Sequence, residues 1–272
     1  MTTLKQILKS KLTKKQRSII PNSFDIVGDI AIFSDFPEEL KTKEKVIANT
    51  LLSLHKNLKI VVKKTKHFSG KYRLQKVKIL AGENRKTTIH KENNIIAKLN
   101  IETCYFSPRL ATERLRVTNQ IKPNESVLVM FSGISIYPLV ISKNSRAKEV
   151  YAVEINPEAH KYAQENLKLN KITNIKLFKG DVKIVIPKIK KKFDRILMPL
   201  PKSAETYLNL ALSKIKKKGI IHFYDFQYEK DIPEKSIEKI KKHIKEFKIL
   251  KVVKCGQYSP RNYRVCVDFK VQ

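Results

Sequence analysis

Cysteine and glycine are scarce in this chain, and long apolar runs are missing. Its 272 residues include 3 Cys, 7 Gly and 11 Pro, so there is little room for flexible linkers. The cysteines, Cys104, Cys255 and Cys266, have neither metal-ligand spacing nor an even count. Together with the lack of a signal peptide, this predicts a reducing, cytosolic setting without a metal site. No apolar run approaches the roughly 18 residues that a membrane-spanning helix needs.

Positive charge is what the chain has in excess. Lys and Arg number 57 and Asp and Glu 25, so the formal net charge is +32. The hydrophobic fraction of 42% is too high for a disordered polycation, and a folded, basic protein is expected. Such a surface attracts polyanions, because each neutralised phosphate releases condensed counterions. The alternative is that most of the lysines are merely solvated.

The first 98 residues predict a small α+β domain, and residues 99–125 a connecting segment. The expected elements are a basic amphipathic helix at 4–20 closed by Pro21, a strand at 24–33 interrupted by Gly28 and Asp29, a helix at 43–56, strands at 60–63 and 72–80, and a small hairpin before Leu99. We interpret this domain as one that contributes to RNA binding and to the active site.

Strands and helices alternate from residue 126 to 272, which predicts a doubly wound parallel sheet of α/β class. The expected strands are 127–131, 149–154, 175–178, 195–198 and 219–224. Asn156 and Pro157 supply an N-cap and a first-turn proline for one of the helices between them. Two further strands, 249–254 and 263–269, follow each other as a hairpin. A parallel sheet that ends in an antiparallel pair resembles the Rossmann-like domain of class I S-adenosylmethionine methyltransferases.

Three strand ends carry residues suited to a nucleoside cofactor, which binds at the carboxyl ends of such strands. Gly133 lets the backbone approach a ligand closely. The carboxylate of Glu154 can accept both hydroxyl hydrogens of a ribose, and that of Asp181 a hydrogen bond from an adenine amino group. A nicotinamide cofactor is disfavoured, because no Gly-x-Gly-x-x-Gly sequence is present.

S-adenosylmethionine is therefore the expected cofactor. Its methionine carboxylate needs fewer binding groups than a pyrophosphate does, and either Arg109 or a backbone amide can bind it. The predicted cofactor-binding residues are Arg109, Phe131, Gly133, Glu154, Ile155, Asp181, Val182 and Pro199.

Four motifs are more specific than the sheet. They are Ser23-Phe-Asp-Ile-Val-Gly-Asp-Ile-Ala-Ile32, Gly70-Lys-Tyr-Arg73, Phe106-Ser-Pro-Arg-Leu-Ala-Thr-Glu-Arg114 and Leu200-Pro-Lys-Ser-Ala204. With them the sequence resembles, over essentially its whole length, the archaeal and eukaryotic tRNA (guanine-37, N1)-methyltransferases. A small extra N-terminal domain that many members carry is expected to be missing here.

The resemblance implies roles for three residues. Glu113 matches the general base that takes the proton from N1 of guanine, which is unreactive until that proton is removed. Arg73 matches the arginine that faces guanine O6, where negative charge develops. Arg114 is expected to orient the base or to hold the phosphate of the target nucleotide. The alternative is that Glu113 and Arg114 form an exposed ion pair of little energetic value.

Two departures from the family pattern matter. Val129 stands where relatives have an acid after the first strand, and Pro199 stands where most have an asparagine whose amide contacts the target base. Pro199 allows three interpretations: lost activity, neutral drift, or membership of an archaeal branch with proline at this position. We favour the third. That branch resembles bifunctional enzymes that methylate N1 of guanosine 37 and also C7 of 4-demethylwyosine, giving isowyosine.

The expected partner is the anticodon arm of tRNA around position 37, whose base must leave its stack to be methylated. The predicted RNA-binding residues are Lys9, Lys14, Arg17, Lys71, Tyr258 and Arg261. Lysines at 188–192 and 214–218 are expected at the opposite, amino-terminal edge of the sheet. No membrane partner is expected, and a monomer is favoured. Two alternatives stay open: an aminocarboxypropyl transferase of wyosine synthesis, and an inactive tRNA-binding protein.

Overall fold

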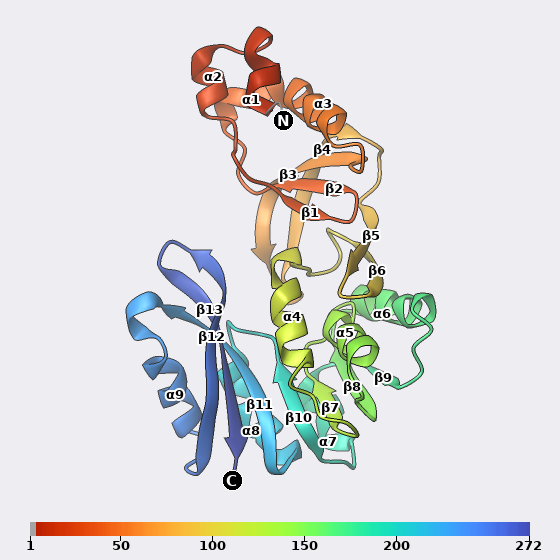
Figure 1. Ribbon diagram of the computed structural model, residues 1–272, viewed down its shortest axis with the longest axis vertical. Helices are drawn as coiled ribbons and strands as arrows, with labels where there is room; N and C mark the ends of the chain where they lie inside the picture. The colour runs from red at the N-terminus through yellow and green to blue at the C-terminus, as the bar shows by residue number, and fades with distance from the viewer. Residues whose placement is uncertain (1–3) are drawn as a thin grey trace. The chain divides into compact units, whose positions relative to one another are not determined.

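The computed structural model describes residues 4–272, which form two compact units (Figure 1). The first unit comprises the chain up to Lys91 together with Ile96–Pro108, and the second comprises Glu92–Ile95 and Arg109–Gln272. The segment 99–125, expected as a connection, is thus divided between the two units at Pro108.

The first unit combines helices with a four-stranded sheet in the order β1-β2-β3-β4. Its elements are α1 (Leu4–Ile7), η1 (Leu8–Ser10), α2 (Lys14–Ser18), β1 (Asp25–Val27), β2 (Ile30–Phe33), η2 (Glu38–Lys43), α3 (Glu44–Leu54), β3 (Ile60–Ser69) and β4 (Leu74–Gly82). The apolar side of α3 packs on this sheet through Ala48 and Leu51, which contact Phe33 and Val61 in one buried cluster. The predicted α+β character is confirmed.

The helix expected at 4–20 is broken, and that prediction was wrong. Thr13 is extended, with a ψ of 163°, and its hydroxyl oxygen accepts a hydrogen bond from the Gln16 amide. The Gln16 side chain in turn accepts one from the Thr13 amide. This capping box starts a new helix at Lys14, so the apolar spacing before it belongs to a separate short helix.

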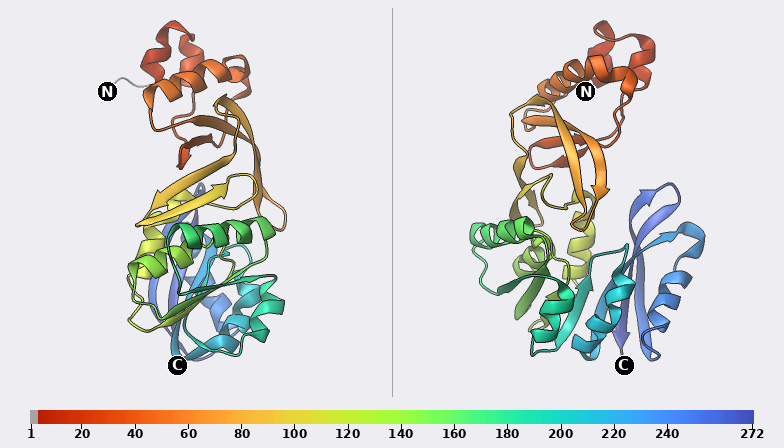
Figure 2. Two further views of the ribbon diagram at one scale, coloured as in Figure 1. Left: turned by 90° about the vertical axis from the view of Figure 1, so that its right-hand side faces the viewer. Right: turned by 180° about the vertical axis from the view of Figure 1, so that it is seen from behind.

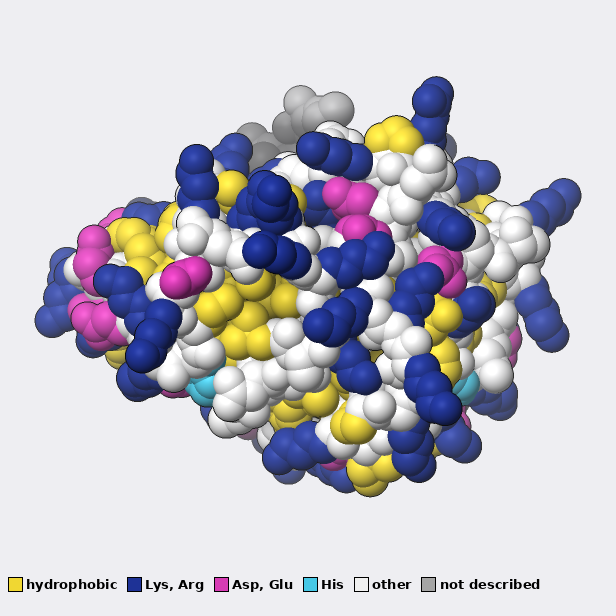
Figure 3. All heavy atoms as spheres, turned by 90° about the horizontal axis from the view of Figure 1, so that it is seen from below, with side chains coloured by type: hydrophobic (Ala, Val, Ile, Leu, Met, Phe, Trp, Pro, Cys, Tyr) yellow, Lys and Arg dark blue, Asp and Glu magenta, His cyan; other side chains and the backbone are white. Residues whose placement is uncertain are grey.

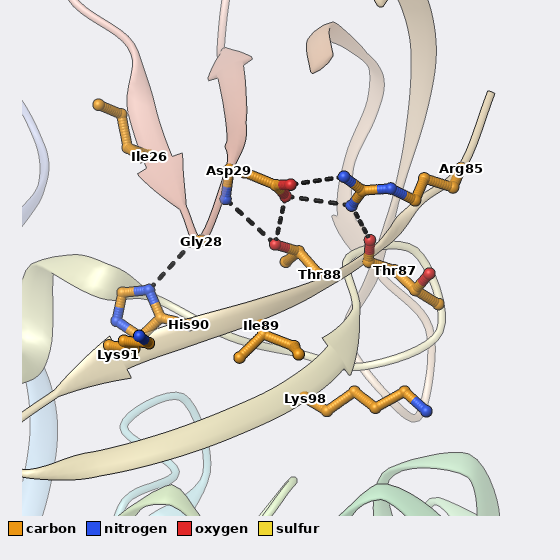
Figure 4. A pocket seen from close by; sticks show the side chains of 10 residues that line it. All are labelled: Ile26, Gly28, Asp29, Arg85, Thr87, Thr88, Ile89, His90, Lys91 and Lys98. Atoms are coloured by element: carbon orange, nitrogen blue, oxygen red, sulfur yellow. Dashed lines mark hydrogen bonds and ion pairs between the residues drawn. The ribbon is translucent and has the colours of Figure 1, made fainter. Parts of the chain in front are cut away.

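The interruption at Gly28 and Asp29 is the turn of an antiparallel hairpin rather than a break in one strand. Gly28 has a φ of +58°, and a Cβ there would lie 2.0 Å from the hydroxyl of Thr88, so only glycine fits. Asp29 accepts hydrogen bonds from Thr88 and from both terminal nitrogens of Arg85 (Figure 4). Arg85 holds the pKa of the Asp29 carboxyl below its usual range. Asp29, Arg85 and Thr88, which bind one another, line a pocket of about 620 Å³ at this turn together with apolar residues such as Ile26 and Ile89.

The hairpin expected before Leu99 is confirmed as β5 (Thr87–Glu92) and β6 (Ile95–Asn100). Its turn residues, Asn93 and Asn94, have φ angles of 42° and 62°. Asparagine tolerates this left-handed conformation, which a two-residue hairpin turn requires.

The second unit is built on a seven-stranded sheet in the order β12-β13-β11-β10-β7-β8-β9. Its strands are β7 (Ser126–Val129), β8 (Glu149–Glu154), β9 (Ile175–Lys179), β10 (Phe193–Met198), β11 (Ile215–Tyr228), β12 (Phe247–Ser259) and β13 (Asn262–Val271). The helical elements are η3 (Pro108–Leu110), α4 (Ala111–Thr118), α5 (Ile136–Asn144), α6 (Pro157–Leu169), α7 (Val182–Lys188), η4 (Ala204–Tyr207), α8 (Leu208–Lys214), η5 (Glu229–Asp231) and α9 (Glu234–Lys241).

Strands β7 to β11 run parallel, and β13 joins β11 antiparallel, as predicted. Helices lie on both faces of this sheet (Figures 1 and 2). The core on one face joins Ile186 of α7, Leu208 of α8 and Ile240 of α9 to Phe223 of β11. Strand order reverses between β7 and β10, so a topological switch point lies where these two strands end.

Basic side chains are spread over the amino-terminal edge of this sheet rather than gathered in one patch (Figure 3). Residues 188–192 lead from the end of α7 to β10, whereas residues 214–218 are the last residue of α8 and the first four residues of β11. Both lysine runs therefore lie at the edge opposite the strand ends, as expected. Within residues 4–272, no helix is long and apolar enough to cross a membrane.

Candidate active site

The loop after β7 lies at the switch point and turns sharply. Phe131 and Ser135 have φ angles of 58° and 63°, and Gly133 also has a φ of 58°. Three left-handed residues within five positions let the chain turn from β7 into α5 while its amides stay close to the strand ends. The Phe131 ring packs edge-on against Tyr207, with centroids 5.0 Å apart.

Glu154 ends β8 and points its carboxylate at this loop. Its Oε2 accepts a hydrogen bond of 2.6 Å from the Gly133 amide, and its Oε1 accepts one of 2.7 Å from the Asn156 amide. Burial raises the pKa of Glu154, and the two amide bonds oppose that rise. Each carboxylate oxygen keeps a lone pair for a further donor, as binding of ribose hydroxyls requires.

Asp181 and its neighbours occupy the end of β9. The Asp181 side chain caps α7 by accepting a hydrogen bond of 2.9 Å from the Lys183 amide, and it remains half-buried. Val182 is buried, and Ile155, after β8, is half-buried. The structure thus brings Gly133, Glu154 and Asp181 to one edge of the sheet, at the ends of β7, β8 and β9.

Two serines in the same loop have buried hydroxyl groups that lack a partner. Ser132 Oγ and Ser135 Oγ make no hydrogen bond to any of residues 4–272. A buried hydroxyl without a hydrogen bond is costly, and each such group calls for an explanation. A polar ligand at this edge would provide one, so the residues present fit a nucleoside cofactor. The sequence analysis did not single out either serine.

Pro199 sits at the centre of a very tight turn after β10. The Leu200 amide donates a hydrogen bond of 2.8 Å to the carbonyl of Met198, which closes a three-residue γ-turn around Pro199. The fixed φ of proline suits the central position of an inverse γ-turn, and the missing amide is not needed there. The strand end thus offers a carbonyl acceptor and an apolar ring, without a side-chain amide.

Glu113 lies on α4 and is only 5% exposed. Its Oε2 accepts a hydrogen bond of 2.6 Å from Arg116 Nε, and its Oε1 accepts 2.8 Å from Arg116 Nη2 and 2.7 Å from the hydroxyl of Tyr224. The alternative of an exposed ion pair with Arg114 is therefore wrong. Glu113 is instead a buried carboxylate with a bidentate arginine partner.

Arg114 is engaged elsewhere. Its Nε and Nη2 donate hydrogen bonds of 2.5 Å to the two carboxylate oxygens of Glu92, and the side chains are 2% and 5% exposed. The pair anchors α4 to the end of β5. The expected contact of Arg114 with the base or with a phosphate stays a prediction.

Arg73 belongs to the first unit, where it ends the turn between β3 and β4 with a φ of 53°. Its guanidinium lies over the Tyr105 ring, 4.9 Å from the centroid, and Phe68 packs edge-on against the same ring. This stacking restricts the side chain. Its expected role at guanine O6 stays a prediction.

Comparison with known proteins decides the family. The TRM5/TYW2 methyltransferase domain matches residues 88–253, and the TYW2 N-terminal domain matches residues 4–85. The chain belongs to the TRM5/TYW2 methyltransferase family. The family resemblance and the class I methyltransferase fold predicted from sequence are both confirmed.

Two relatives show how this chain compares with named enzymes. It is 42% identical to the tRNA (guanine(37)-N(1))-methyltransferase Trm5b of Pyrococcus abyssi, over 94% of this chain and 76% of the relative. It is 33% identical to the tRNA (guanine(37)-N(1))/4-demethylwyosine(37)-methyltransferase Taw22 of Nanoarchaeum equitans, over 90% of this chain and 98% of the relative.

Two solved structures have the same fold. The complex of aTrm5 with tRNALeu superimposes with a TM-score of 0.86 at 30% identity, over 99% of this chain and 78% of that chain. The TYW2 of Methanocaldococcus jannaschii, solved in complex with AdoMet, has a TM-score of 0.69 at 28% identity, over 91% and 98% of the two chains.

The residues predicted to bind RNA are distributed over both units. Lys9, Lys14 and Lys71 are exposed in the first unit, where Arg17 is half-buried; Tyr258 and Arg261 are exposed at the β12–β13 hairpin of the second. Tyr258 is 63% exposed, and its ring lies 4.4 Å from that of Phe226. Their contacts with RNA stay predictions.

Sequence reasoning missed the partners of Glu113. Arg116 lies three residues after Glu113 on α4, so the helical i,i+3 spacing was a usable signal. Tyr224, on β11, is far away in sequence, and only the fold brings it to Glu113.

The Glu92–Arg114 pair supplies a test of the anchoring role. Replacing one partner breaks an ion pair whose two side chains are both buried, so Arg114→Met and Glu92→Leu should each lower the free energy of unfolding by about 3–5 kcal/mol. The double variant should recover most of that loss, because two apolar side chains can fill the same space. Urea unfolding of the four proteins measures this coupling. Additive losses in the double variant would contradict a direct pair.

Proposed function

We propose that this protein transfers a methyl group from S-adenosylmethionine to the nucleoside at position 37 of tRNA. The observation that carries the proposal is Glu113, a buried carboxylate held in place by Arg116 and Tyr224 in a member of this family. N1 of guanine bears a proton at neutral pH, and a carboxylate within hydrogen-bond reach can remove it. Glu113 is thus the general base for N1 methylation.

The strand ends of the second unit hold the cofactor. Glu154 takes the ribose hydroxyls and Asp181 the adenine amino group, while Ser132 and Ser135 supply hydroxyl groups that are otherwise unpartnered. When bound, S-adenosylmethionine supplies an electrophilic methyl group on its sulfonium. The backbone at Gly133 allows close approach, since no side chain intervenes.

Pro199 supports a second methylation, at C7 of 4-demethylwyosine to give isowyosine. The γ-turn leaves no side-chain amide at the end of β10, so a tricyclic base meets an apolar ring rather than a hydrogen-bonding group. The name of the Nanoarchaeum equitans relative contains both reactions. We therefore propose a bifunctional enzyme of wyosine-derivative biosynthesis, working in the cytoplasm as a monomer.

The anticodon arm of tRNA is the proposed partner. A net charge of +32 favours a polyanion, and binding of phosphates lowers the cost of taking the target base out of its stack. Exposed cations of both units are available for this, together with the aromatic ring of Tyr258.

An aminocarboxypropyl transferase is the second candidate. It uses the same cofactor but transfers the other alkyl arm, and the match of residues 4–85 to the TYW2 N-terminal domain favours it. The product mass separates the two reactions.

Nucleoside mass spectrometry tests the function. The protein is incubated with S-adenosylmethionine and either an unmodified tRNA with guanosine 37 or one bearing 4-demethylwyosine. We expect both nucleosides to gain about 14 Da, the mass of one methyl group replacing hydrogen. A heavier product on the tricyclic base would show that the protein transfers an aminocarboxypropyl group to it rather than a methyl group. No modification of either tRNA would overturn the enzymatic proposal.

Pro199→Asn tests the substrate preference. An asparagine would reopen the γ-turn and place an amide at the end of β10, so kcat/KM for 4-demethylwyosine should fall at least about tenfold relative to guanosine. The matched control is Pro201→Ala, two residues further along the same loop. Equal losses on both substrates for Pro199→Asn would show that this residue does not discriminate between them.

A further inference from the structure

A chain of buried ionic contacts continues behind Glu113. Arg116 contacts Glu113 on one side and, on the other, donates hydrogen bonds of 2.5 and 3.2 Å to the carboxylate of Asp268 on β13. The guanidinium is thereby clamped between two carboxylates. A guanidinium held on two sides has little freedom to rotate, so its orientation relative to Glu113 is restricted.

Asp268 is itself held firmly. It is fully buried, and it accepts hydrogen bonds from His222 Nδ1 at 2.6 Å, Gln120 Nε2 at 3.0 Å and Cys266 Sγ at 3.2 Å. Burial opposes its ionisation, but His222 and Arg116 outweigh burial and hold the pKa of Asp268 well below its usual range. Asp268 therefore stays a carboxylate throughout the working pH range.

His222 is fixed in one tautomer by its neighbours. Arg195 Nη1 lies 2.8 Å from His222 Nε2, and an arginine can only donate, so Nε2 accepts and Nδ1 carries the proton that binds Asp268. Burial lowers the pKa of His222, which favours the same neutral form. Although His222, Cys266 and Asp268 have ligand atoms within 4.8 Å of one another, Arg116 and Arg195 contact the cluster and their positive charges disfavour a metal ion there.

Stability alone is a weak reason for such a network. Taking several charges out of water costs free energy that apolar residues of similar size would not incur. The network does, however, end on the proposed base. A carboxylate can accept about four hydrogen bonds, and Arg116 and Tyr224 fill three positions on Glu113, leaving one for an incoming N–H.

We propose that Arg116 and Asp268 are positioning residues for the methyl transfer: Asp268 fixes Arg116, and Arg116 holds the Glu113 carboxylate oriented toward the N1 proton. The inference rests on the proposed N1 methylation. Neither residue touches the reacting atoms, so both act through Glu113.

Besides Arg114, which is paired with Glu92, four titratable groups around Glu113 have raised pKa values and are uncharged. Burial raises the pKa of Tyr224 on β11 and of Tyr137 on α5. Burial also raises the pKa of Cys255 on β12 to about 12, and that of Cys266 on β13 above its ordinary value. Among these groups and the network, Arg116 is the cation in contact with Glu113. Removing a cation from contact with a carboxylate disfavours the charged form of that carboxylate.

Arg116→Met removes the charge and keeps much of the volume, whereas Arg116→Lys keeps the charge. Asp268→Asn leaves Arg116 in place but releases it. kcat and the KM for unmodified tRNA are measured against pH at saturating S-adenosylmethionine, with urea unfolding of each variant alongside. We expect Arg116→Met to lower kcat about 100-fold, with KM for tRNA changed by less than about threefold, and to move the acid limb of the rate profile to higher pH. Arg116→Lys should restore part of kcat and return the acid limb toward its original position.

The matched control is Lys239→Met, in the same unit, which also removes a cation from a buried carboxylate, that of Asp225. It should lower stability without moving the acid limb. An Arg116→Met enzyme that loses kcat only in proportion to its unfolded fraction, with its acid limb unmoved, would overturn the positioning role. Wild-type protein that leaves guanosine 37 unmodified would instead overturn the proposed function, so the two failures are distinguishable.

Discussion

Burying a carboxylate is costly unless an opposite charge pairs with it, and the second unit supplies that charge to Glu113. Arg116 provides it, Asp268 on β13 fixes Arg116, and His222 on β11 fixes Asp268. Strands β11 and β13 are antiparallel neighbours in which His222 lies opposite Asp268. The register of this strand pair therefore sets the position of Asp268 and, through Arg116, the orientation of the Glu113 carboxylate. On the proposed mechanism, the terminal antiparallel strands contribute to the orientation of the base as well as to the fold.

The residues proposed to bind the cofactor are brought together by a different constraint, the shared direction of the parallel strands. Since β7, β8 and β9 end at one edge, the loop at Gly133 receives Glu154 from β8 and lies beside the end of β9. The two unpartnered serine hydroxyls lie in this same loop. Binding a polar ligand there would satisfy groups whose burial is otherwise costly.

Sequence patterns were sufficient for the parallel sheet, because buried strands and their crossover helices leave local periodic signals. The N-cap at Asn156 was predicted for the same reason and is present, with its side chain accepting a hydrogen bond from the Glu158 amide. Local signals misled at Thr13, because the apolar spacing continues past this residue while its capping box divides the first helix. Long-range ion pairs such as Arg116 with Asp268, or Arg114 with Glu92, could not be predicted, because nothing in the intervening sequence specifies which charged residues form pairs.

The central claim is that Glu113 removes the N1 proton of guanosine 37. The most direct measurement is the single-turnover rate of methyl transfer to unmodified tRNA by wild-type protein and by Glu113→Gln, with tRNA affinity measured in parallel. Glutamine keeps the size of the side chain but cannot take up the proton, so the account predicts a rate at least about 100-fold lower and tRNA affinity unchanged. A Glu113→Gln protein that methylates guanosine 37 as fast as wild type would contradict it.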